Sequence, residues 1–70
     1  GYIETPLVSD YLQGLEPLKK KSLVDSHLIG RLGSVNDISH VVNFLLLPQS
    51  SWITGVNLPV DGGFTLGKRL

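Results

Sequence analysis

The 70-residue chain contains no cysteine and no methionine, and its six basic residues balance its six acidic residues. Without cysteine, the sequence has no disulfide bonds, no thiolate metal sites and no dithiol redox motif. A formal net charge of zero argues against partners that are recognised mainly through charge, such as duplex DNA or an anionic membrane surface. We therefore expect no nucleic-acid partner and no membrane partner.

Long hydrophobic runs are also missing. The longest apolar stretch, Phe44–Leu47, is far shorter than the roughly 20 residues of a membrane span. The first residues lack the basic and apolar regions of a secretory signal, and we therefore expect a cytoplasmic protein.

The composition is that of a folded segment, because 41% of the residues are hydrophobic and only 17% are charged. Because so short a chain buries little core alone, we expect it to need a partner.

Helix start and stop signals predict two helices in the first half of the chain. Thr5 is a good N-cap, and Pro6 fits the first helical position, where its missing N–H costs nothing. Gly14 is a suitable end for this first helix. A second start follows at Glu16-Pro17. These signals place the helices over about residues 6–13 and 17–28.

A third helix is predicted over about residues 35–47. Ser34 and Asp37 have the spacing of a capping box, with an acid at the positive end of the helix. Apolar residues recur at helical spacing between Val35 and Leu46. Pro48 ends the pattern, because proline removes a hydrogen-bond donor and restricts the residue before it.

After Pro48 the apolar period changes to two, which predicts a strand over about residues 56–60. Pro59 cannot donate to a ladder, so this is an edge strand, and Asp61-Gly62-Gly63 is a turn signal that ends it. A single strand cannot pair its own backbone groups. The predicted fold class is therefore α/β, with at least one partner strand supplied from elsewhere.

Neither histidine predicts catalysis or metal binding. Ser26 and His27 are adjacent, so on a helix their side chains point in different directions. His40 follows Asp37 by three residues, a spacing typical of a solvated helix surface, and no His-x-x-x-His pair is present. Gly-rich phosphate loops of the dinucleotide or Walker type are absent too. We assign no catalytic residue and no metal ligand within these 70 residues.

The loop Gly30-Arg31-Leu32-Gly33 lies between two predicted helices and loosely resembles the G-x-x-G loop with which KH modules clamp a nucleic-acid backbone. The chain lacks the strand expected before that loop and the basic face that backbone binding requires. A small KH-like nucleic-acid-binding module is kept as an alternative function. A non-catalytic packing or oligomerisation segment is a second alternative.

Four blocks in order resemble the short-chain dehydrogenase/reductase family. Gly1–Pro6 resembles its P-G-x-I-x-T-P segment, and Gly30–Ile38 resembles its G-R-x-G lead into a late helix. Ser51–Gly55 and Leu58–Gly63 resemble its I-T-G-x-x-L-x-V-D-G-G ending. The resemblance implies the C-terminal part of a Rossmann-like doubly wound parallel sheet that is incomplete alone. Within it we expect residues 1–6 to form a cofactor loop and residues 7–29 to form a substrate lid. Residues 30–70 would supply the last helix, the last strand and the tail.

The resemblance also implies an activity and partners. The whole enzyme would transfer hydride between NAD or NADP and a small-molecule alcohol or carbonyl substrate. Its remaining N-terminal part would complete the domain, and the enzyme would form a homo-oligomer, a dimer or a tetramer. The glycine-rich loop and the catalytic Tyr-x-x-x-Lys pair of the family are absent, since Pro6 and Leu15 stand four residues after Tyr2 and Tyr11. The 70 residues alone are therefore expected to be inactive.

The family pattern also assigns site residues. The implied cofactor-binding residues are Gly1, Ile3 and Thr5, with the Ile3 backbone at the nicotinamide carboxamide and the Thr5 hydroxyl at the carboxamide or the pyrophosphate. Such groups can orient a nicotinamide ring without adding charge. The implied residues of the substrate pocket and lid are Tyr2, Leu7 and Tyr11.

Overall fold

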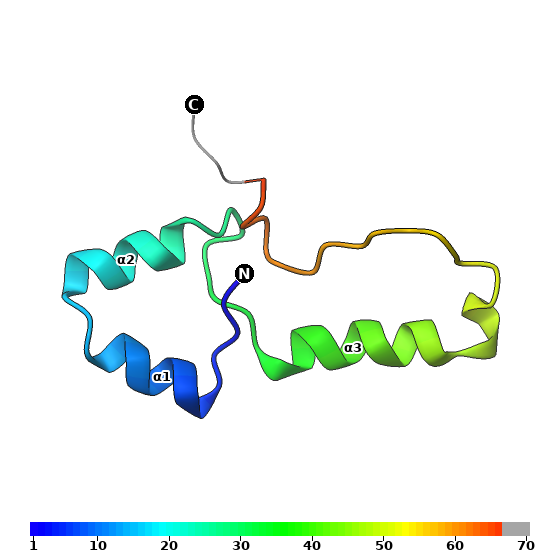
Figure 1. Ribbon diagram of the computed structural model, residues 1–70, viewed down its shortest axis with the longest axis horizontal. Helices are drawn as coiled ribbons and strands as arrows, with labels where there is room; N and C mark the ends of the chain where they lie inside the picture. The colour runs from blue at the N-terminus through cyan, green and yellow to red at the C-terminus, as the bar shows by residue number, and fades with distance from the viewer. Residues whose placement is uncertain (67–70) are drawn as a thin grey trace.

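The structure is a computed structural model that describes residues 1–66; residues 67–70 of the predicted tail lie outside the described part. Three α-helices and one short 3-10 helix follow one another along the chain: α1 (Pro6–Gln13), α2 (Pro17–Asp25), α3 (Val35–Leu46) and η1 (Pro48–Ser50). Figure 1 shows α1 and α2 on one side of the molecule, and α3 with its extended return segment on the other. The two sides meet where the N-terminal segment passes the loop before α3 and the last turn of the described chain.

Helix α1 has the predicted bounds because both of its caps form. Thr5 Oγ1 accepts a hydrogen bond from the Val8 amide at 3.3 Å, and Pro6 occupies the first turn. At the other end, the Gly14 amide donates to carbonyls of the last turn. Leu12, which is 4% exposed, is the residue that α1 buries.

Helix α2 is shorter than predicted, because it ends at Asp25 and not near residue 28. In a continuing helix, the Leu23 carbonyl would accept from the amide of His27. Here that carbonyl accepts instead from Ser26 Oγ and faces His27 Nδ1 at 3.0 Å, while the His27 amide donates to Val24. Side chains that compete for backbone groups favour a helix end. The prediction of residues 17–28 is thus corrected to Pro17–Asp25.

Helix α3 forms over nearly the predicted residues. Ser34 Oγ accepts from the Asp37 amide, and Asp37 in turn accepts from the Ser34 amide at 2.7 Å, so the capping box is complete. The helix ends one residue early, because Leu47 has an extended backbone with ψ 142° before Pro48.

The predicted strand at residues 56–60 does not form among residues 1–66. The β contact that these residues contain is one isolated parallel bridge, between Ile3 and Gly33. A strand is stable only when its backbone groups find a partner strand, and none of the described residues pairs with this segment. The turn that follows is present, since Gly62 and Gly63 have φ of 62° and 85°, values that glycine adopts without strain.

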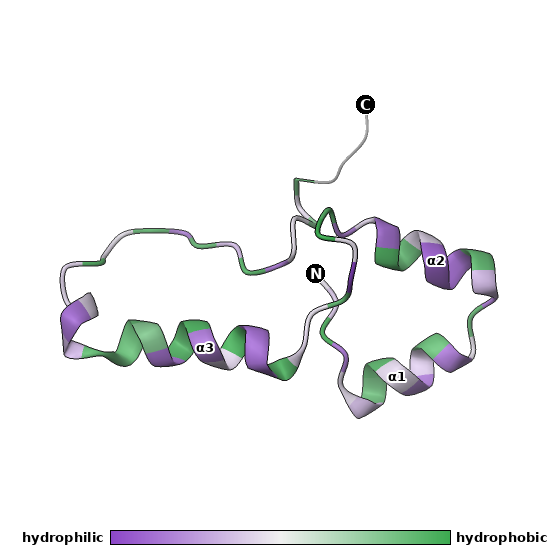
Figure 2. Ribbon diagram, turned by 180° about the vertical axis from the view of Figure 1, so that it is seen from behind, coloured by the Kyte–Doolittle hydropathy of each residue, from purple (hydrophilic) through white to green (hydrophobic). Residues whose placement is uncertain are grey.

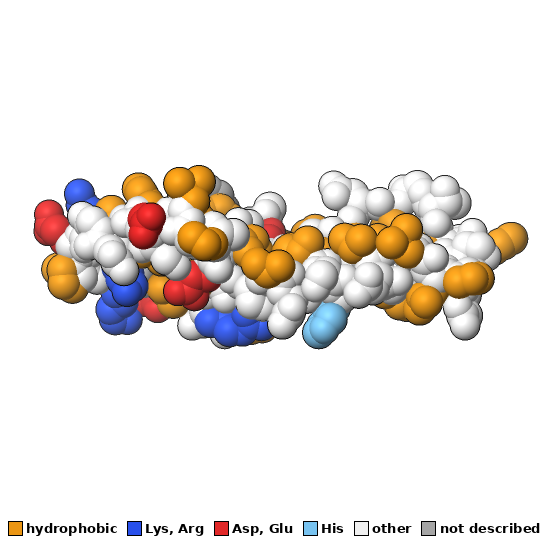
Figure 3. All heavy atoms as spheres, turned by 90° about the horizontal axis from the view of Figure 1, so that it is seen from below, with side chains coloured by type: hydrophobic (Ala, Val, Ile, Leu, Met, Phe, Trp, Pro, Cys, Tyr) orange, Lys and Arg blue, Asp and Glu red, His pale blue; other side chains and the backbone are white. Residues whose placement is uncertain are grey.

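Apolar side chains stay largely on the surface. Leu12 and Leu32 form the buried apolar core of the described residues, and the radius of gyration is 14.7 Å, against about 11 Å for a compact domain of this length. Figures 2 and 3 show hydrophobic residues along α3 and the segment that returns from it. We call this the α3 apolar face; it comprises the exposed residues Val35, Val42, Phe44, Leu45, Leu46, Trp52, Ile53, Val56 and Leu58. Among residues 1–66, no helix has the length and apolarity to cross a bilayer.

The first testable prediction follows from this small core. As an isolated peptide, the 70-residue chain should be partly helical by far-UV circular dichroism and should lose that signal gradually on heating. Two buried apolar side chains supply too little apolar burial to offset the entropy of ordering the backbone. A sharp transition with one midpoint in both far-UV dichroism and Trp52 fluorescence would contradict this expectation.

Candidate functional site

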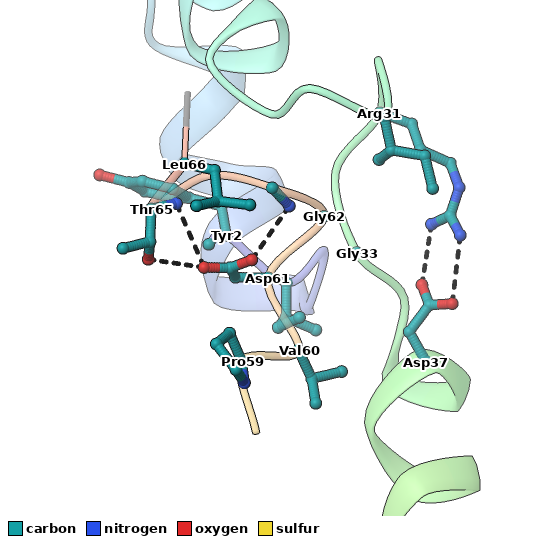
Figure 4. Close-up of a pocket in the computed structure, with 14 residues that line it drawn as sticks. Tyr2, Arg31, Gly33, Asp37, Pro59, Val60, Asp61, Gly62, Thr65 and Leu66 are labelled. Atoms are coloured by element: carbon teal, nitrogen blue, oxygen red, sulfur yellow. Dashed lines mark hydrogen bonds and ion pairs between the residues drawn. The ribbon is translucent and has the colours of Figure 1, made fainter. Parts of the chain in front are cut away.

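Three segments that are distant in the sequence line one cavity of about 480 Å³. They are the start of the chain, the loop before α3, and the turn near residues 59–66 (Figure 4). Gly1, Tyr2 and Ile3 contribute from the first segment. The structure therefore places Gly1 and Ile3, two of the three predicted cofactor-binding residues, in one cavity wall together with Tyr2.

The backbone of the first segment is held by the loop before α3. The Gly33 amide donates to the Tyr2 carbonyl at 2.9 Å, and the Glu4 amide donates to the Gly33 carbonyl at 2.8 Å. In such a parallel bridge, the residue between the two bonded positions turns its own N–H away from the partner. The Ile3 amide accordingly has no acceptor among residues 1–66, while the Ile3 carbonyl accepts from Thr5.

This pairing brings Gly33 close to the N-terminal segment. A Cβ at Gly33 would lie 2.6 Å from Ile3 Cδ1, the movable end of that side chain, and 3.5 Å from the Tyr2 carbonyl oxygen. A side chain at position 33 would require the Ile3 side chain to shift, and glycine lets the two segments approach without that shift.

Thr5, the third predicted cofactor-binding residue, lies at the start of α1 and does not line the 480 Å³ cavity. Its hydroxyl oxygen accepts from the Val8 amide, which leaves the hydroxyl hydrogen available to donate. The side chain is half-buried. Thr5 can thus cap the helix and still offer a hydrogen bond to a ligand.

The predicted substrate residues separate into two groups. Tyr2 and Tyr11 line a second, more open cavity of about 350 Å³ together with Leu15 and Phe64. Leu7 does not line it and is 80% exposed. The structure places the two tyrosines in the lining of one cavity and leaves Leu7 on the open surface of α1.

An ion pair that the sequence did not reveal fixes the loop before α3. The Arg31 guanidinium donates to both carboxylate oxygens of Asp37, at 2.8 and 3.2 Å (Figure 4). Arg31, together with the Ser34 amide and hydroxyl, holds the pKa of Asp37 well below its usual range. The same carboxylate raises the pKa of Arg31. Asp37 therefore serves both as the capping residue of α3 and as the partner of the loop cation.

The turn after residue 60 is fixed by a second carboxylate. Asp61 accepts from the Thr65 hydroxyl and amide and from the Gly63 amide, at 2.6, 3.2 and 3.0 Å (Figure 4). The Thr65 side chain and amide, with the Gly63 amide, lower the pKa of Asp61. These bonds hold the turn closed next to the N-terminal segment.

His27 is the functional candidate that sequence reasoning missed. It is 1% exposed, the most deeply buried side chain of the described residues. Its Nε2 accepts a hydrogen bond from the Tyr2 amide at 3.0 Å, and its Nδ1 lies 3.0 Å from the Leu23 carbonyl. The Leu23 contact is local, but Tyr2 lies 25 residues away and is brought to His27 by the tertiary fold, so no local pattern points to this role.

The remaining candidates have ordinary surroundings. His40 is exposed on α3, and the Asp37 carboxylate binds Arg31. No group of three or more His, Asp or Glu side chains that could hold a metal ion occurs within residues 1–66. The 480 Å³ cavity is lined by backbone groups, by apolar and aromatic side chains, and by Arg31, Asp37 and Asp61, whose charges are engaged in hydrogen bonds within the chain.

The sequence matches known proteins over nearly its whole length. The model of the family described as enoyl-(acyl carrier protein) reductase matches residues 1–65. The chain therefore belongs to the short-chain dehydrogenase/reductase family, as the four sequence blocks predicted. No solved structure matches the chain.

Its relatives include plant and bacterial proteins. A tropinone reductase homolog of Arabidopsis thaliana is 46% identical over 65 residues, and senescence-associated protein 13 of the same plant is 45% identical over 65 residues. A cyclohexanol dehydrogenase of Acinetobacter sp. is 38% identical over 65 residues. Each of these alignments covers 93% of this chain and 23% of the relative. The chain thus spans about a quarter of the length of these proteins.

The Arg31–Asp37 pair generates a prediction of pH dependence. The pKa of Asp37 is lowered in the folded chain. The ionised carboxylate therefore stabilises the fold fully above the ordinary carboxyl pKa of about 4, and this stabilisation is lost as the pH falls through the lowered pKa of the folded chain. Asp37→Asn should lower the thermal midpoint of the polypeptide that contains these residues near neutral pH. The difference from the wild type should shrink steadily as the pH is lowered below about 4.

A matched control removes another aspartate that has an ion-pair partner. Asp25 pairs with Lys21 at 2.7 Å, but both side chains are largely exposed, and such pairs contribute little. Asp25→Asn should leave the thermal midpoint nearly unchanged. An Asp37→Asn deficit of constant size at every pH, or one no larger than that of Asp25→Asn, would disprove the role given to the Arg31–Asp37 pair.

Proposed function

We propose that these residues form the nicotinamide side of the active site in an oxidoreductase that transfers hydride between NAD or NADP and an alcohol or carbonyl substrate. The observation that carries this proposal is the Ile3 amide, which is turned away from Gly33 and has no acceptor among residues 1–66. The Thr5 hydroxyl lies two residues further along the same segment. Membership of the short-chain dehydrogenase/reductase family supports the assignment.

The donors fit the uncharged end of a nicotinamide cofactor. A carboxamide has one carbonyl oxygen to accept and one amino group to donate, and the Ile3 amide and the Thr5 hydroxyl offer matching partners. Gly1 contributes the bare backbone at the cavity wall. When bound, NAD or NADP supplies the hydride donor or acceptor. The residues of this chain then orient the nicotinamide ring and hold it at a fixed position relative to the substrate.

The two tyrosines and Phe64 are proposed to form part of the substrate pocket. Tyr2 lines both cavities, so it joins the cofactor side to the substrate side. Residues 7–29 are proposed as the lid, with Leu7 on its exposed surface. Helix α2 buries none of its residues and has no side-chain cap at Glu16. Elements held by so few contacts are those that open and close over a substrate.

The catalytic groups are proposed to come from residues beyond these 70. A protonated or deprotonated side chain must exchange a proton with the substrate oxygen as hydride moves. Neither Tyr2 nor Tyr11 has the lysine four residues later that the family's catalytic pair requires. The chain covers about a quarter of its relatives, and on this proposal it completes a site that the rest of the protein begins.

The α3 apolar face is proposed to pack against that remaining part in a Rossmann-like parallel sheet. Trp52 is 94% exposed, and so large an apolar side chain is normally buried against a partner. Residues 56–60 would then become an edge strand, with residues 30–70 as the last helix, last strand and tail. A dimeric or tetrameric assembly and a cytoplasmic location stay predictions.

The KH-like alternative gains no support from the loop at Gly30–Gly33. Arg31, the cation that would meet a nucleic-acid phosphate, is bound to Asp37, and Gly33 is engaged by the N-terminal segment. The alternative of a packing segment is compatible with the α3 apolar face, and it differs from the leading proposal in predicting no cofactor binding.

Thr5 provides the test. In the whole polypeptide that contains these 70 residues, Thr5→Ala should weaken NADH or NADPH binding by about three- to tenfold. This is the loss expected for one hydrogen bond. Binding is measured by titrating the fluorescence of the reduced cofactor. Thr5→Ser should restore affinity, because it keeps the hydroxyl.

A matched variant separates the cofactor contact from the helix cap. Thr5→Gly removes the hydroxyl without adding another hydrogen-bond donor, and glycine at an N-cap costs a helix only about a few tenths of a kcal/mol. It should keep the thermal midpoint close to that of the wild type while binding cofactor as weakly as Thr5→Ala. If Thr5→Gly binds as tightly as the wild type, Thr5 is a cap alone. If the wild type binds neither reduced cofactor, the proposed function is wrong.

A further inference from the structure

We propose that His27 is a positioning residue that holds the cofactor segment, residues 1–6, in its binding conformation. The inference rests on the proposed function and adds to it a residue that the family pattern did not supply. His27 lies two residues after the end of α2, so it connects the lid directly to the segment that faces the cofactor.

The two peptide groups on either side of the Tyr2 Cα atom are held by different parts of the chain. The Tyr2 N–H, in the peptide that Gly1 and Tyr2 share, donates to His27 Nε2 at 3.0 Å. The Tyr2 carbonyl oxygen, in the peptide that carries the Ile3 N–H, accepts from the Gly33 amide at 2.9 Å. Gly33 therefore sets the direction of the Ile3 N–H, and His27 fixes the peptide before it, so that the backbone at Tyr2 is held on both sides.

The imidazole is also packed tightly on three sides. Its ring centroid lies 4.9 Å from that of Phe64 and 6.3 Å from that of Tyr2. A Cβ placed on Gly1 would come within 2.8 Å of His27 Nε2, so the start of the segment also lies against the ring. Such packing prevents the ring from turning away and giving up its hydrogen bonds.

The hydrogen bonds determine which nitrogen carries the proton. The Leu23 carbonyl can only accept, so Nδ1 carries the hydrogen, and the Tyr2 amide can only donate, so Nε2 is bare. We call the two bonds that hold the backbone at Tyr2, one to His27 Nε2 and one from the Gly33 amide, the Tyr2 clamp.

The consequence is that cofactor affinity should depend on the acceptor at position 27. Without that acceptor, the Tyr2 amide loses its hydrogen bond, and the peptide before the one that carries the Ile3 N–H is no longer held. Binding of the carboxamide end should then weaken, although His27 does not line the 480 Å³ cavity.

The experiment compares three variants of the polypeptide that contains these residues, with binding of NADH or NADPH measured by titrating the fluorescence of the reduced cofactor. His27→Phe keeps a ring but removes both hydrogen bonds, and it should weaken cofactor binding about tenfold, because a buried donor is left without an acceptor. His27→Gln supplies both an acceptor and a donor. His40→Gln is the matched control, because His40 is the other histidine and is exposed.

The expected pattern is specific. The wild type, His40→Gln and His27→Gln should bind cofactor with similar affinity, whereas His27→Phe should bind about tenfold more weakly. Hydrogen exchange at the Tyr2 amide should be slow in the wild type and in His27→Gln and fast in His27→Phe. The inference is overturned if folded His27→Phe binds cofactor as tightly as the wild type, or if His27→Gln binds as weakly as His27→Phe while its Tyr2 amide exchanges slowly.

The design also separates this inference from the proposed function. If the wild type binds neither reduced cofactor, the proposed function fails, and the positioning role falls with it. Exchange at the Tyr2 amide then still reports whether the clamp exists. If the wild type binds cofactor and the position-27 variants bind it with the same affinity, the proposed function stands and the positioning role of His27 is wrong.

Discussion

The backbone at Tyr2 is the point on which the described structure depends. Its carbonyl oxygen accepts a hydrogen bond from Gly33 and its N–H donates one to His27, and so it joins the start of the chain to the end of α2 and to the loop before α3. Apolar burial cannot hold these parts together, because Leu12 and Leu32 make up the apolar core among residues 1–66. Directional bonds and the closed turn at Asp61 take its place. The cavity that we assign to the cofactor exists because these bonds bring its walls together.

Features that depend on neighbouring residues were predictable from the sequence, and features that depend on distant ones were not. The caps at Thr5 and Ser34 formed as expected, because a side chain three residues away satisfies the first free amides. The end of α2 was predicted too late, since the competition for the Leu23 carbonyl depends on where His27 packs. The strand at residues 56–60 was wrong for the described chain, because a strand is defined by a partner that the residues themselves do not contain.

The same distinction applies to the site. Family motifs led to Gly1, Tyr2 and Ile3, which the structure places in one cavity. They did not lead to His27, which lies in the variable lid and is recognised only by its burial and its two bonds. Leu7 was expected in the substrate pocket and lies on the open surface of α1. A lid residue reaches its substrate through a movement that the sequence pattern does not describe.

The proposed lid and the cofactor segment have opposite requirements, and His27 stands between them. A lid must move, and α2 is suited to movement because it buries no residue. A nicotinamide must be held still, because hydride transfer tolerates little error in the distance between the reacting atoms. A hydrogen bond from the end of the moving element to the fixed segment couples the two requirements. Opening of α2 beyond its last turn would pull the imidazole from the Tyr2 amide and release the peptide group before the one that carries the Ile3 N–H. On this argument, release of the cofactor and opening of the lid are one event, linked through a single bond of 3.0 Å.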